Sequence, residues 1–181
     1  MTKDSIIEDE LIQSALSGNR SAFSDLVAIY QTKIRGYCFH MLRNTEEAED
    51  AAQEVFLRAF RKLDTYKSEA KFSTWLYTIA TNYSIDCLRK KKRNKEIPEH
   101  MQSETQIYSS MKAEGALSEN IELKLSSKNQ LSLLLAQLPE DYRAILLLRE
   151  AEGLSYEELA ETLSCTLDSV KSKLKRARKR L

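Results

Sequence analysis

The stretch SYEELAETLSCTLDSVKSKLKRARKRL, residues 155–181, decides the fold of the C-terminal part of the chain. It predicts a helix, a tight turn and a second helix that is rich in cations. Apolar residues recur at helical spacing in the second helix and predict one buried stripe. That stripe consists of Val170, Leu174, Ala177 and Leu181. A helix-turn-helix of this kind presents its second helix to the major groove of DNA.

Charge is segregated along this part of the chain. Residues 166–181 hold seven basic residues and one acidic residue, whereas residues 138–165 hold seven acidic and two basic ones. A cationic helix can be merely a solvated surface, but this one-sided distribution favours contact with DNA. Asp168 or Ser169 can cap the start of the second helix. Its remaining faces carry Lys171, Lys173, Lys175, Arg176, Arg178, Lys179 and Arg180.

The composition is that of a helix-rich globular protein. Of the 181 residues, 42% are hydrophobic and 30% are charged, and there are only 4 Gly and 2 Pro. No apolar run approaches the length of a membrane span, and the N-terminus does not resemble a signal peptide, so we expect a cytoplasmic protein without direct membrane insertion. The three cysteines are far apart, which predicts reduced thiols, no metal site and no cofactor.

The hydrophobic pattern divides the chain into three segments. Residues 1–93 are almost entirely helical in pattern, residues 94–122 contain six acidic residues and no sustained apolar stripe, and helical periodicity returns over residues 123–181. We therefore predict an all-α protein with two small helical domains joined by a flexible linker. The acidic composition of the linker fits a functional segment and a loop without a role equally well.

Several residues mark the expected ends of helices. Gly18 and Gly153 each stop a helix, and Pro139 can begin one. Asn44, followed by Glu47, resembles a capping box for a third helix. Ser73 or Thr74 is expected to cap the fourth helix.

The third predicted helix, residues 45–63, has two contrasting faces. The core face is expected to hold Ala48, Ala52, Val55, Phe56, Ala59, Phe60 and Leu63. The opposite face holds Asp50, Gln53, Glu54, Leu57 and Arg61. Leu57 can be an ordinary exposed leucine, or it can be the centre of a small protein-binding patch with a polar rim.

Residues 58–95 combine positive charge with aromatic rings. They hold eleven basic and three acidic residues, with six cations within residues 89–95. Basic grooves with aromatic platforms bind single-stranded nucleic acid. On the fourth predicted helix, one strip offers the Trp75 ring, the Asn82 amide and the Arg89 cation. A lone tryptophan more often belongs to a core, but a buried asparagine would need hydrogen-bond partners.

Five motifs occur in an order that resembles one protein family over nearly the whole chain. They are DAAQEVF (residues 50–56), FSTWLYTIATN (72–82), LPEDYR (138–143), GLSYEELA (153–160) and VKSKL (170–174). Together they resemble the extracytoplasmic-function (ECF) sigma factors of bacterial RNA polymerase. This resemblance implies a protein that directs promoter recognition and DNA melting, and that performs no enzymatic reaction.

The resemblance also implies partners. The first domain would bind the clamp of core RNA polymerase and the melted minus-ten element, and the second would dock on the polymerase flap and read the minus-thirty-five element as duplex. An anti-sigma factor is a further expected partner. The alternative, a stand-alone helix-turn-helix regulator, would need a ligand-binding, phosphorylated or dimerising domain in place of residues 1–93.

Site residues follow from the resemblance by position. Those expected to bind core polymerase are Asp50, Gln53, Glu54, Leu57 and Arg58. Those expected at the minus-ten element are Tyr66, Lys67, Lys71, Trp75, Asn82 and Arg89, where residues 66–71 match the loop that captures a flipped base. Those expected at the minus-thirty-five element are Ser169, Lys171, Ser172, Lys173, Lys175, Arg176 and Arg178.

The chain departs from the family pattern at the start of the DNA-reading helix. Asp168 and Ser169 stand where the family commonly has Gly-Thr, and several family arginines are lysines. Since lysine cannot make the bidentate guanine contact of arginine, we expect a different base preference.

Overall fold

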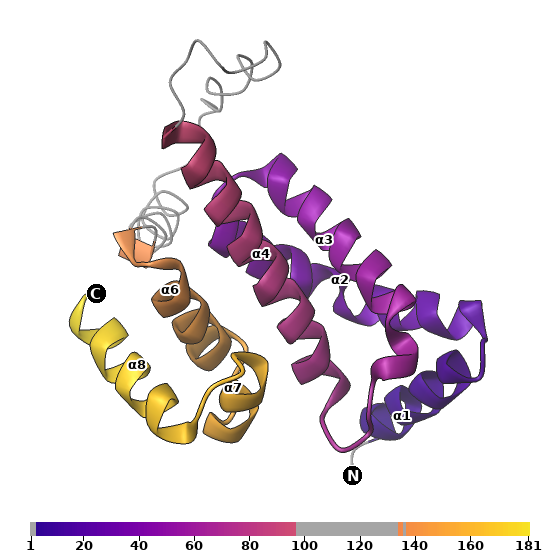
Figure 1. Ribbon diagram of the computed structural model, residues 1–181. Helices are drawn as coiled ribbons and strands as arrows, with labels where there is room; N and C mark the ends of the chain where they lie inside the picture. The colour runs from indigo at the N-terminus through magenta and orange to yellow at the C-terminus, as the bar shows by residue number, and fades with distance from the viewer. Residues whose placement is uncertain (1–2, 97–133, 136) are drawn as a thin grey trace, which may run out of the picture.

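The computed structural model describes residues 3–96, 134–135 and 137–181 (Figure 1). The described residues form helices and no strand. The first helical unit comprises α1 (Lys3–Leu16), α2 (Arg20–Leu42), α3 (Thr45–Arg61), the short 3-10 turn η1 (Leu63–Thr65) and α4 (Phe72–Glu96). The second comprises α6 (Glu140–Leu146), the π-helical turn η3 (Leu147–Ala151), α7 (Tyr156–Thr162) and α8 (Leu167–Lys179). Most of the predicted linker, residues 94–122, and the start of the predicted second domain lie outside the described residues.

Local signals explain most helix ends of the first unit. Gly18 has a φ of +94°, a left-handed conformation that suits glycine and ends α1. The Asn44 side chain accepts a hydrogen bond from the Glu47 N–H at 2.9 Å and thereby caps α3. The predicted capping box is only half formed, because the Glu47 carboxylate accepts instead from Lys91 Nζ of α4 at 2.7 Å.

The fourth helix begins earlier than the sequence predicted. Its first turn already includes Phe72, and the Trp75 N–H donates to the Lys71 carbonyl at 3.2 Å. Ser73 and Thr74 therefore lie inside the helix, and their prediction as caps was wrong. Phe72 is buried against the rings of Tyr30 and Tyr66, which draws this residue into the helix.

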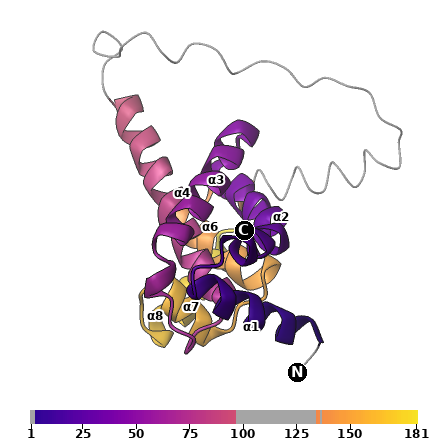
Figure 2. The same ribbon diagram turned by 90° about the vertical axis from the view of Figure 1, so that its right-hand side faces the viewer.

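The core of the first unit surrounds α2. This helix packs against α1, α3 and α4 (Figure 2). Its apolar side buries Leu26, Ile34 and Met41 almost completely. Tyr37 is also buried, and its hydroxyl shares a hydrogen bond of 2.8 Å with the Thr81 hydroxyl of α4. Burial of this apolar stripe is the main stabilising contribution to the unit.

The second unit is the predicted helix-turn-helix with one helix before it. Pro139 directly precedes α6, and Gly153, with a φ of +73°, follows η3. A full capping box starts α7: the Ser155 hydroxyl accepts from the Glu158 N–H at 3.1 Å, and the Glu158 carboxylate accepts from the Ser155 N–H at 2.7 Å. Two of these features, Pro139 and Gly153, were predicted from the sequence.

The second helix of the helix-turn-helix, α8, differs in detail from its prediction. Val170, Leu174 and Ala177 are buried as expected, but Leu181 lies beyond the end of the helix and is 46% exposed. The cap is Thr166, whose hydroxyl accepts from the Ser169 N–H at 3.2 Å. The prediction that Asp168 or Ser169 caps the helix was therefore wrong.

The two units lie side by side. Helices α6 and α7 contact α4, and α6 also contacts α2 (Figure 1). Arg143 of α6 is buried and donates a hydrogen bond to the Met41 carbonyl of α2.

Candidate nucleic-acid interface and protein-binding groove

An open groove of about 820 Å³ runs between α2 and α3. Its lining includes Gln53, Phe56, Leu57 and Phe60 from α3 and Phe23 from α2. Leu57 is 51% exposed and Phe60 is 45% exposed, so the predicted core position of Phe60 was wrong. Leu57 is thus not a lone apolar residue among charges, because the exposed Phe60 and the partly buried Phe56 line the same groove.

The residues predicted to bind core polymerase do not all lie in this groove. Gln53 and Leu57 line it, whereas Asp50 is exposed elsewhere on α3. Arg58 forms an ion pair of 2.8 Å with Glu54, and its guanidinium lies 4.6 Å from the centre of the Tyr83 ring of α4. Glu54 and Arg58 are therefore engaged with each other, and Arg58 also contacts α4.

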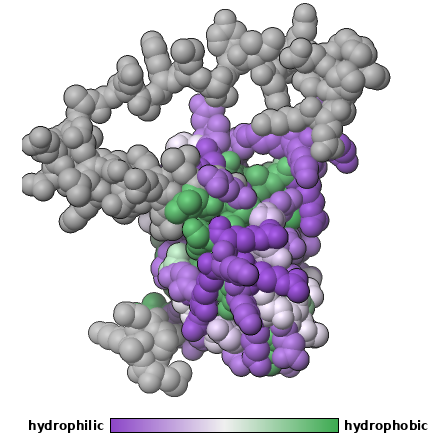
Figure 3. Space-filling view, turned by 90° about the vertical axis from the view of Figure 1, so that its left-hand side faces the viewer, coloured by the Kyte–Doolittle hydropathy of each residue, from purple (hydrophilic) through white to green (hydrophobic). Residues whose placement is uncertain are grey.

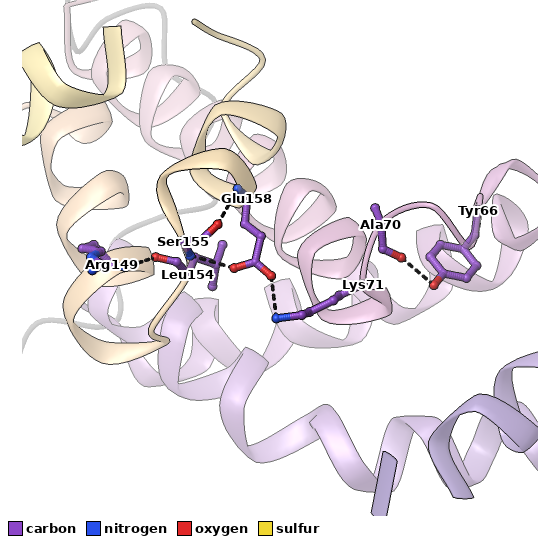
Figure 4. A network of polar contacts seen from close by, with 7 residues as sticks. All are labelled: Tyr66, Ala70, Lys71, Arg149, Leu154, Ser155 and Glu158. Carbon is purple, nitrogen blue, oxygen red and sulfur yellow. Dashed lines mark hydrogen bonds and ion pairs between the residues drawn. The ribbon is translucent and has the colours of Figure 1, made fainter. Parts of the chain in front are cut away.

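The loop before α4 is built on an aromatic cluster. The Tyr66 ring lies 5.4 Å from the Phe72 ring and 5.5 Å from the Trp75 ring, and its hydroxyl donates to the Ala70 carbonyl at 2.8 Å (Figure 4). Trp75 is partly buried in this cluster, whereas Lys67 is exposed. These contacts fix the shape of the loop.

A hollow of about 380 Å³ lies beside this loop. Tyr66, Lys71 and Phe72 line it, together with Glu8 of α1 and Tyr30 of α2. The Tyr30 hydroxyl donates to the Glu8 carboxylate at 2.5 Å. Burial, followed by this hydrogen bond, raises the pKa of Tyr30, so the phenol remains protonated and available as a donor at neutral pH.

The polar strip of α4 faces the second unit. Asn82 and Arg89 are exposed, and with Asp86 they line a cavity of about 200 Å³ whose opposite wall includes Asp141 and Lys173. Trp75 does not line this cavity. The structure thus separates the predicted minus-ten residues into the aromatic loop, with Tyr66, Lys71 and Trp75, and the strip of Asn82 and Arg89.

The residues of α8 that were predicted to bind the minus-thirty-five element also form two groups, one inside and one outside a cavity between the two units. Ser169, Ser172, Lys173 and Arg176 line a cavity of about 450 Å³ that also contains Arg89 of α4. The two predicted DNA-binding surfaces therefore face each other.

Other α8 cations lie outside that cavity. Lys175 is exposed, Lys171 lies 3.7 Å from Asp168, and Arg178 forms an ion pair of 2.7 Å with Glu150. The hydrogen bond with Glu150 raises the pKa of Arg178. Hydrophilic side chains dominate the face of the molecule that carries α8 (Figure 3).

Sequence reasoning missed the contacts that join the two units. Lys71 Nζ lies 2.8 Å from Glu158 Oε1, and the Tyr77 hydroxyl donates to the Glu152 carboxylate (Figure 4 shows the first contact). The spacing of Ser155 and Glu158 could have revealed the capping box. The ion pair of Glu158 with Lys71 leaves no signal in the sequence, because it depends on how the two units dock.

The described cysteines do not form a metal or disulfide site. Cys38 is fully buried next to the Ser84 hydroxyl, and burial raises the pKa of its thiol to about 11. A thiol of this kind is protonated and unreactive at neutral pH. No group of His, Cys, Asp and Glu within the described ranges could hold a metal ion.

None of the described helices is long and apolar enough to cross a membrane.

Comparison with solved structures supports the fold. The chain is similar to CnrH in its complex with the cytosolic domain of CnrY, with a TM-score of 0.69 and 22% identity over 96% of this chain and 94% of that one. It is also similar to the sigma factor RpoE in complex with the anti-sigma factor NepR from Bartonella quintana, with a TM-score of 0.66 and 24% identity over 87% of this chain and 92% of that one.

Comparison of sequences shows the family. Residues 26–94 match the family model of Sigma-70 region 2, and residues 128–181 match that of Sigma-70, region 4. The chain is 38% identical to the ECF RNA polymerase sigma factor SigW of Bacillus subtilis (strain 168) over 94% of this chain and 92% of SigW. It is 31% identical to the ECF RNA polymerase sigma-E factor of Escherichia coli (strain K12) over 97% and 92% of the two chains.

These matches extend over both helical units, which disfavours a stand-alone helix-turn-helix regulator. The chain belongs to the ECF sigma factors of RNA polymerase, which direct promoter recognition and DNA melting at the start of transcription.

Proposed function

We propose that this chain acts through three surfaces, one for core RNA polymerase and two for promoter DNA. The observation that carries the proposal is the presence, in one chain, of an apolar groove on α3, an exposed polar strip on α4 and a cationic face on α8. The chain works by binding and not by catalysis, in the cytoplasm where its polymerase is found. Its domains span residues 1–93 and 123–181, with residues 94–122 as a flexible linker.

The groove between α2 and α3 receives the clamp of core polymerase. Leu57 and Phe60 supply exposed apolar area, and Gln53 supplies a polar rim. Such a patch is typical of a protein interface with an apolar centre. Asp50, Glu54 and Arg58 lie on the same helix and contribute charge around the contact, with Arg58 held in place by Glu54 and Tyr83.

The minus-ten element binds in its melted form to the loop before α4 and to the α4 strip. The Asn82 amide can both donate to and accept from an unpaired base, and Lys67, Lys71 and Arg89 can hold phosphates. Tyr66 and Trp75 stabilise the loop through their ring contacts. Bases trapped in this way offset the stacking energy that is lost on melting.

The minus-thirty-five element binds as duplex to α8. The buried stripe of Val170, Leu174 and Ala177 orients the helix, and the opposite side presents Lys171, Lys175 and Arg176. Arg176 can make a bidentate contact with guanine, whereas the lysines suit phosphates. Ser169, Ser172, Lys173 and Arg178 complete this surface.

Two further protein partners belong to this proposal. The second unit docks on the polymerase flap, and an anti-sigma factor binds the chain when it is inactive. The second point is supported by two solved complexes, in which RpoE is bound to the anti-sigma factor NepR and CnrH is bound to the cytosolic domain of CnrY.

Two substitutions test whether the DNA surfaces are separate. With reconstituted holoenzyme and a promoter selected from a random library, Asn82→Ala should weaken binding to a single-stranded minus-ten oligonucleotide about tenfold. It should leave binding to a duplex that carries only the minus-thirty-five element unchanged. Arg176→Ala should do the reverse, at a cost of about 1–3 kcal/mol if it contacts a base.

Lys179→Ala is the matched control for Arg176→Ala, because it removes an equally exposed cation from the same helix. It should lower affinity for the duplex less than Arg176→Ala does. Equal losses on both DNA forms from both substitutions would contradict the assignment of two surfaces.

A further inference from the structure

Two adjoining cavities lie between the first helical unit and the second. One measures about 450 Å³ and the other about 200 Å³, and Arg89, Asp141 and Lys173 line both of them. We propose that these cavities together form a binding site for a nucleoside polyphosphate, with the phosphates in the larger cavity and a base that carries an exocyclic amine in the smaller one. The inference goes beyond the proposed function, because it concerns a free small molecule and involves neither polymerase nor promoter DNA.

The larger cavity gathers positive charge from both units. Its lining includes four cations, which are Arg89 of the first unit and Lys173, Arg176 and Arg180 of the second. Two carboxylates, those of Glu140 and Asp141, also line it, so cations outnumber acids along its wall. A concave surface with one dominant sign of charge concentrates its electric field and attracts ligands of the opposite charge.

These cations are not neutralised by acidic side chains in the part of the chain that the structure describes. Within residues 3–96, 134–135 and 137–181, Arg89, Lys173 and Arg176 form no ion pair. The Arg180 guanidinium lies 5.0 Å from the centre of the Tyr142 ring, a contact that leaves its N–H groups able to donate. Like charges that converge without counter-ions repel one another, and an anion between them offsets that repulsion.

The donor groups of the larger cavity suit a chain of phosphates. A guanidinium can bind two phosphate oxygens at once, and a lysine binds phosphate as a point charge. Ser169 and Ser172 of α8 add hydroxyl donors. The volume of about 450 Å³ lies within the range of about 300–1,000 Å³ that is usual for small-ligand sites. Four cations exceed the charge of a single carboxylate or phosphate, so a ligand with several phosphates matches them best.

The smaller cavity has the lining that a nucleobase requires. Asp86 and Asn82 of α4 and Asp141 of α6 line it, and Ile85 and Leu163 add apolar surface for a flat ring. Carboxylates accept hydrogen bonds from the exocyclic amines of bases, and an asparagine amide both donates and accepts. Two carboxylates repel phosphates, which places the base and not the phosphates here.

Arg89 and Lys173 lie where the two cavities meet, because each of them lines both. A nucleotide has the same order of parts, with the ribose and the first phosphate between the base and the remaining phosphates. Arg89 belongs to the first unit and Lys173 to the second, so one ligand contacts both units. Helix α6 contacts both α4 and α8 and contributes Asp141 to each cavity (Figure 1). The site is therefore shared between the two units.

Titration calorimetry on the full-length chain tests the site with three probes, which are ATP, UTP and inorganic triphosphate. A buffer without divalent cations leaves the whole charge of each triphosphate available. ATP and UTP share their ribose and phosphates, but only the base of ATP carries an exocyclic amine. We expect ATP to bind at a single saturable site, with an affinity about tenfold above that of UTP or of inorganic triphosphate. Absence of saturable ATP binding, or equal affinities for the three probes, would overturn the proposal.

Two pairs of variants locate the site between the units. Arg89→Gln and Lys173→Gln each remove a cation that lines both cavities, and each should weaken ATP binding about tenfold because a charge-assisted hydrogen bond is lost. Arg93→Gln and Lys175→Gln remove exposed cations from the same two helices, and neither residue lines these cavities. The controls should weaken ATP binding less than about twofold, because charges in solvent are screened. Equal losses in the variants and their controls would show a response to net charge alone and would contradict the site.

The double variant Asp86→Ala, Asp141→Ala tests the position of the base. It should bind ATP and UTP with about equal affinity, because the acceptors for the exocyclic amine are gone. The loss of two negative charges raises the affinity for both nucleotides alike, so the ratio of the two affinities is the readout. A ratio that stays as in the wild type would mean that the base does not bind in the smaller cavity, and the two-cavity site would be rejected.

These titrations are independent of the proposed function, because they contain only the chain and a nucleotide. If ATP does not bind, while Asn82→Ala and Arg176→Ala still separate the two DNA forms, this inference fails and the proposed function stands. If ATP binds as expected and those two substitutions do not separate the DNA forms, the assignment of two DNA surfaces fails and the nucleotide site stands.

Discussion

Arg143 joins segments of the chain that are far apart in sequence. Its side chain is only 7% exposed and donates to the carbonyls of Leu135 at 2.9 Å, Leu138 at 3.3 Å and Met41. Met41 lies in the last turn of α2, where a cation is favoured by the exposed carbonyl groups. Burial lowers the pKa of Arg143, but a guanidinium in a protein remains charged.

We expect Arg143→Met to lower the free energy of unfolding by about 2–3 kcal/mol, because it leaves buried carbonyl groups without their donor. Arg143→Lys should lose less, since an ammonium group can still reach one of these carbonyls. Urea denaturation followed by circular dichroism measures both effects. Arg61→Met removes an exposed arginine from α3 and should change stability by less than about 0.5 kcal/mol. A loss as small for Arg143→Met would mean that water replaces the guanidinium.

Sequence reasoning could not have assigned this role to Arg143. The residue belongs to the LPEDYR motif, which identified the family, and its local acceptors Leu135 and Leu138 are nearby in sequence. Its acceptor Met41 is 102 residues away. Such a bond depends on how α6 docks on α2, and helical periodicity carries no information on that.

Helix ends were predicted correctly where a single glycine or a single capping side chain determines the end. Gly18 and Gly153 have positive φ values that favour glycine, and Asn44 has a side chain that suits an N-cap. The cap of α8 was predicted wrongly because three residues close together in the sequence, Thr166, Asp168 and Ser169, could each accept a hydrogen bond. The geometry selects Thr166, since its hydroxyl reaches the N–H three residues later.

The core face of α3 was predicted correctly at its centre and wrongly at its edge. Ala48, Ala52, Val55 and Ala59 are buried as predicted, whereas Phe60 lies in the groove. Ala51 is also buried, although the predicted core face did not include it. Small residues let α2 and α3 approach closely, and a phenylalanine at the edge of that contact is displaced toward solvent. The Phe60 ring instead packs edge-on against Phe23, with 5.1 Å between the ring centres.

The groove on α3 leads to a prediction about polymerase binding. Leu57→Ala should weaken binding to core polymerase about tenfold, or about 1.4 kcal/mol, because it removes apolar area from the centre of the patch. Stability should change by less than about 0.5 kcal/mol, since the side chain is 51% exposed. Fluorescence anisotropy with labelled protein and purified core measures the affinity.

Leu16→Ala provides the control for this prediction. Leu16 is an exposed leucine on α1 that does not line the groove, so its loss should leave core binding unchanged. Equal affinities for wild type and Leu57→Ala would assign the clamp contact to another face of the first unit.

The arrangement of the two units is the feature least accessible from sequence. The pattern of apolar residues predicted both helical units and most of the buried stripe of α8. The contact between them includes polar pairs such as Lys71 with Glu158 and Tyr77 with Glu152. Lys71 was predicted to bind DNA, and neither pairing was predicted. Polar pairs of this kind have no period, so only the three-dimensional arrangement identifies them.

The closed arrangement, in which the two units contact each other through the ion pair of Lys71 with Glu158, should depend on pH through that pair. Burial tends to raise the pKa of Glu158, but hydrogen bonds from Lys71 and from the Ser155 N–H outweigh burial and lower it. The hydrogen bond with Glu158 raises the pKa of Lys71. Glu158 therefore favours closing above its ordinary pKa of about 4.3, and Lys71 favours closing below its ordinary pKa of about 10.4.

A pH series on the wild type and on Glu158→Gln isolates this effect. Between about pH 5 and pH 9 the wild type should have the smaller radius of gyration, because both charges are present in that range. As the pH falls through the lowered pKa of Glu158, the carboxylate is protonated, the ion pair is lost and the two proteins should become equal. Circular dichroism at each pH restricts the comparison to folded protein. A difference that persists in folded protein after the pH has fallen through the pKa of Glu158 would show that the Glu158 charge is not its cause, because glutamine and protonated glutamate carry the same charge.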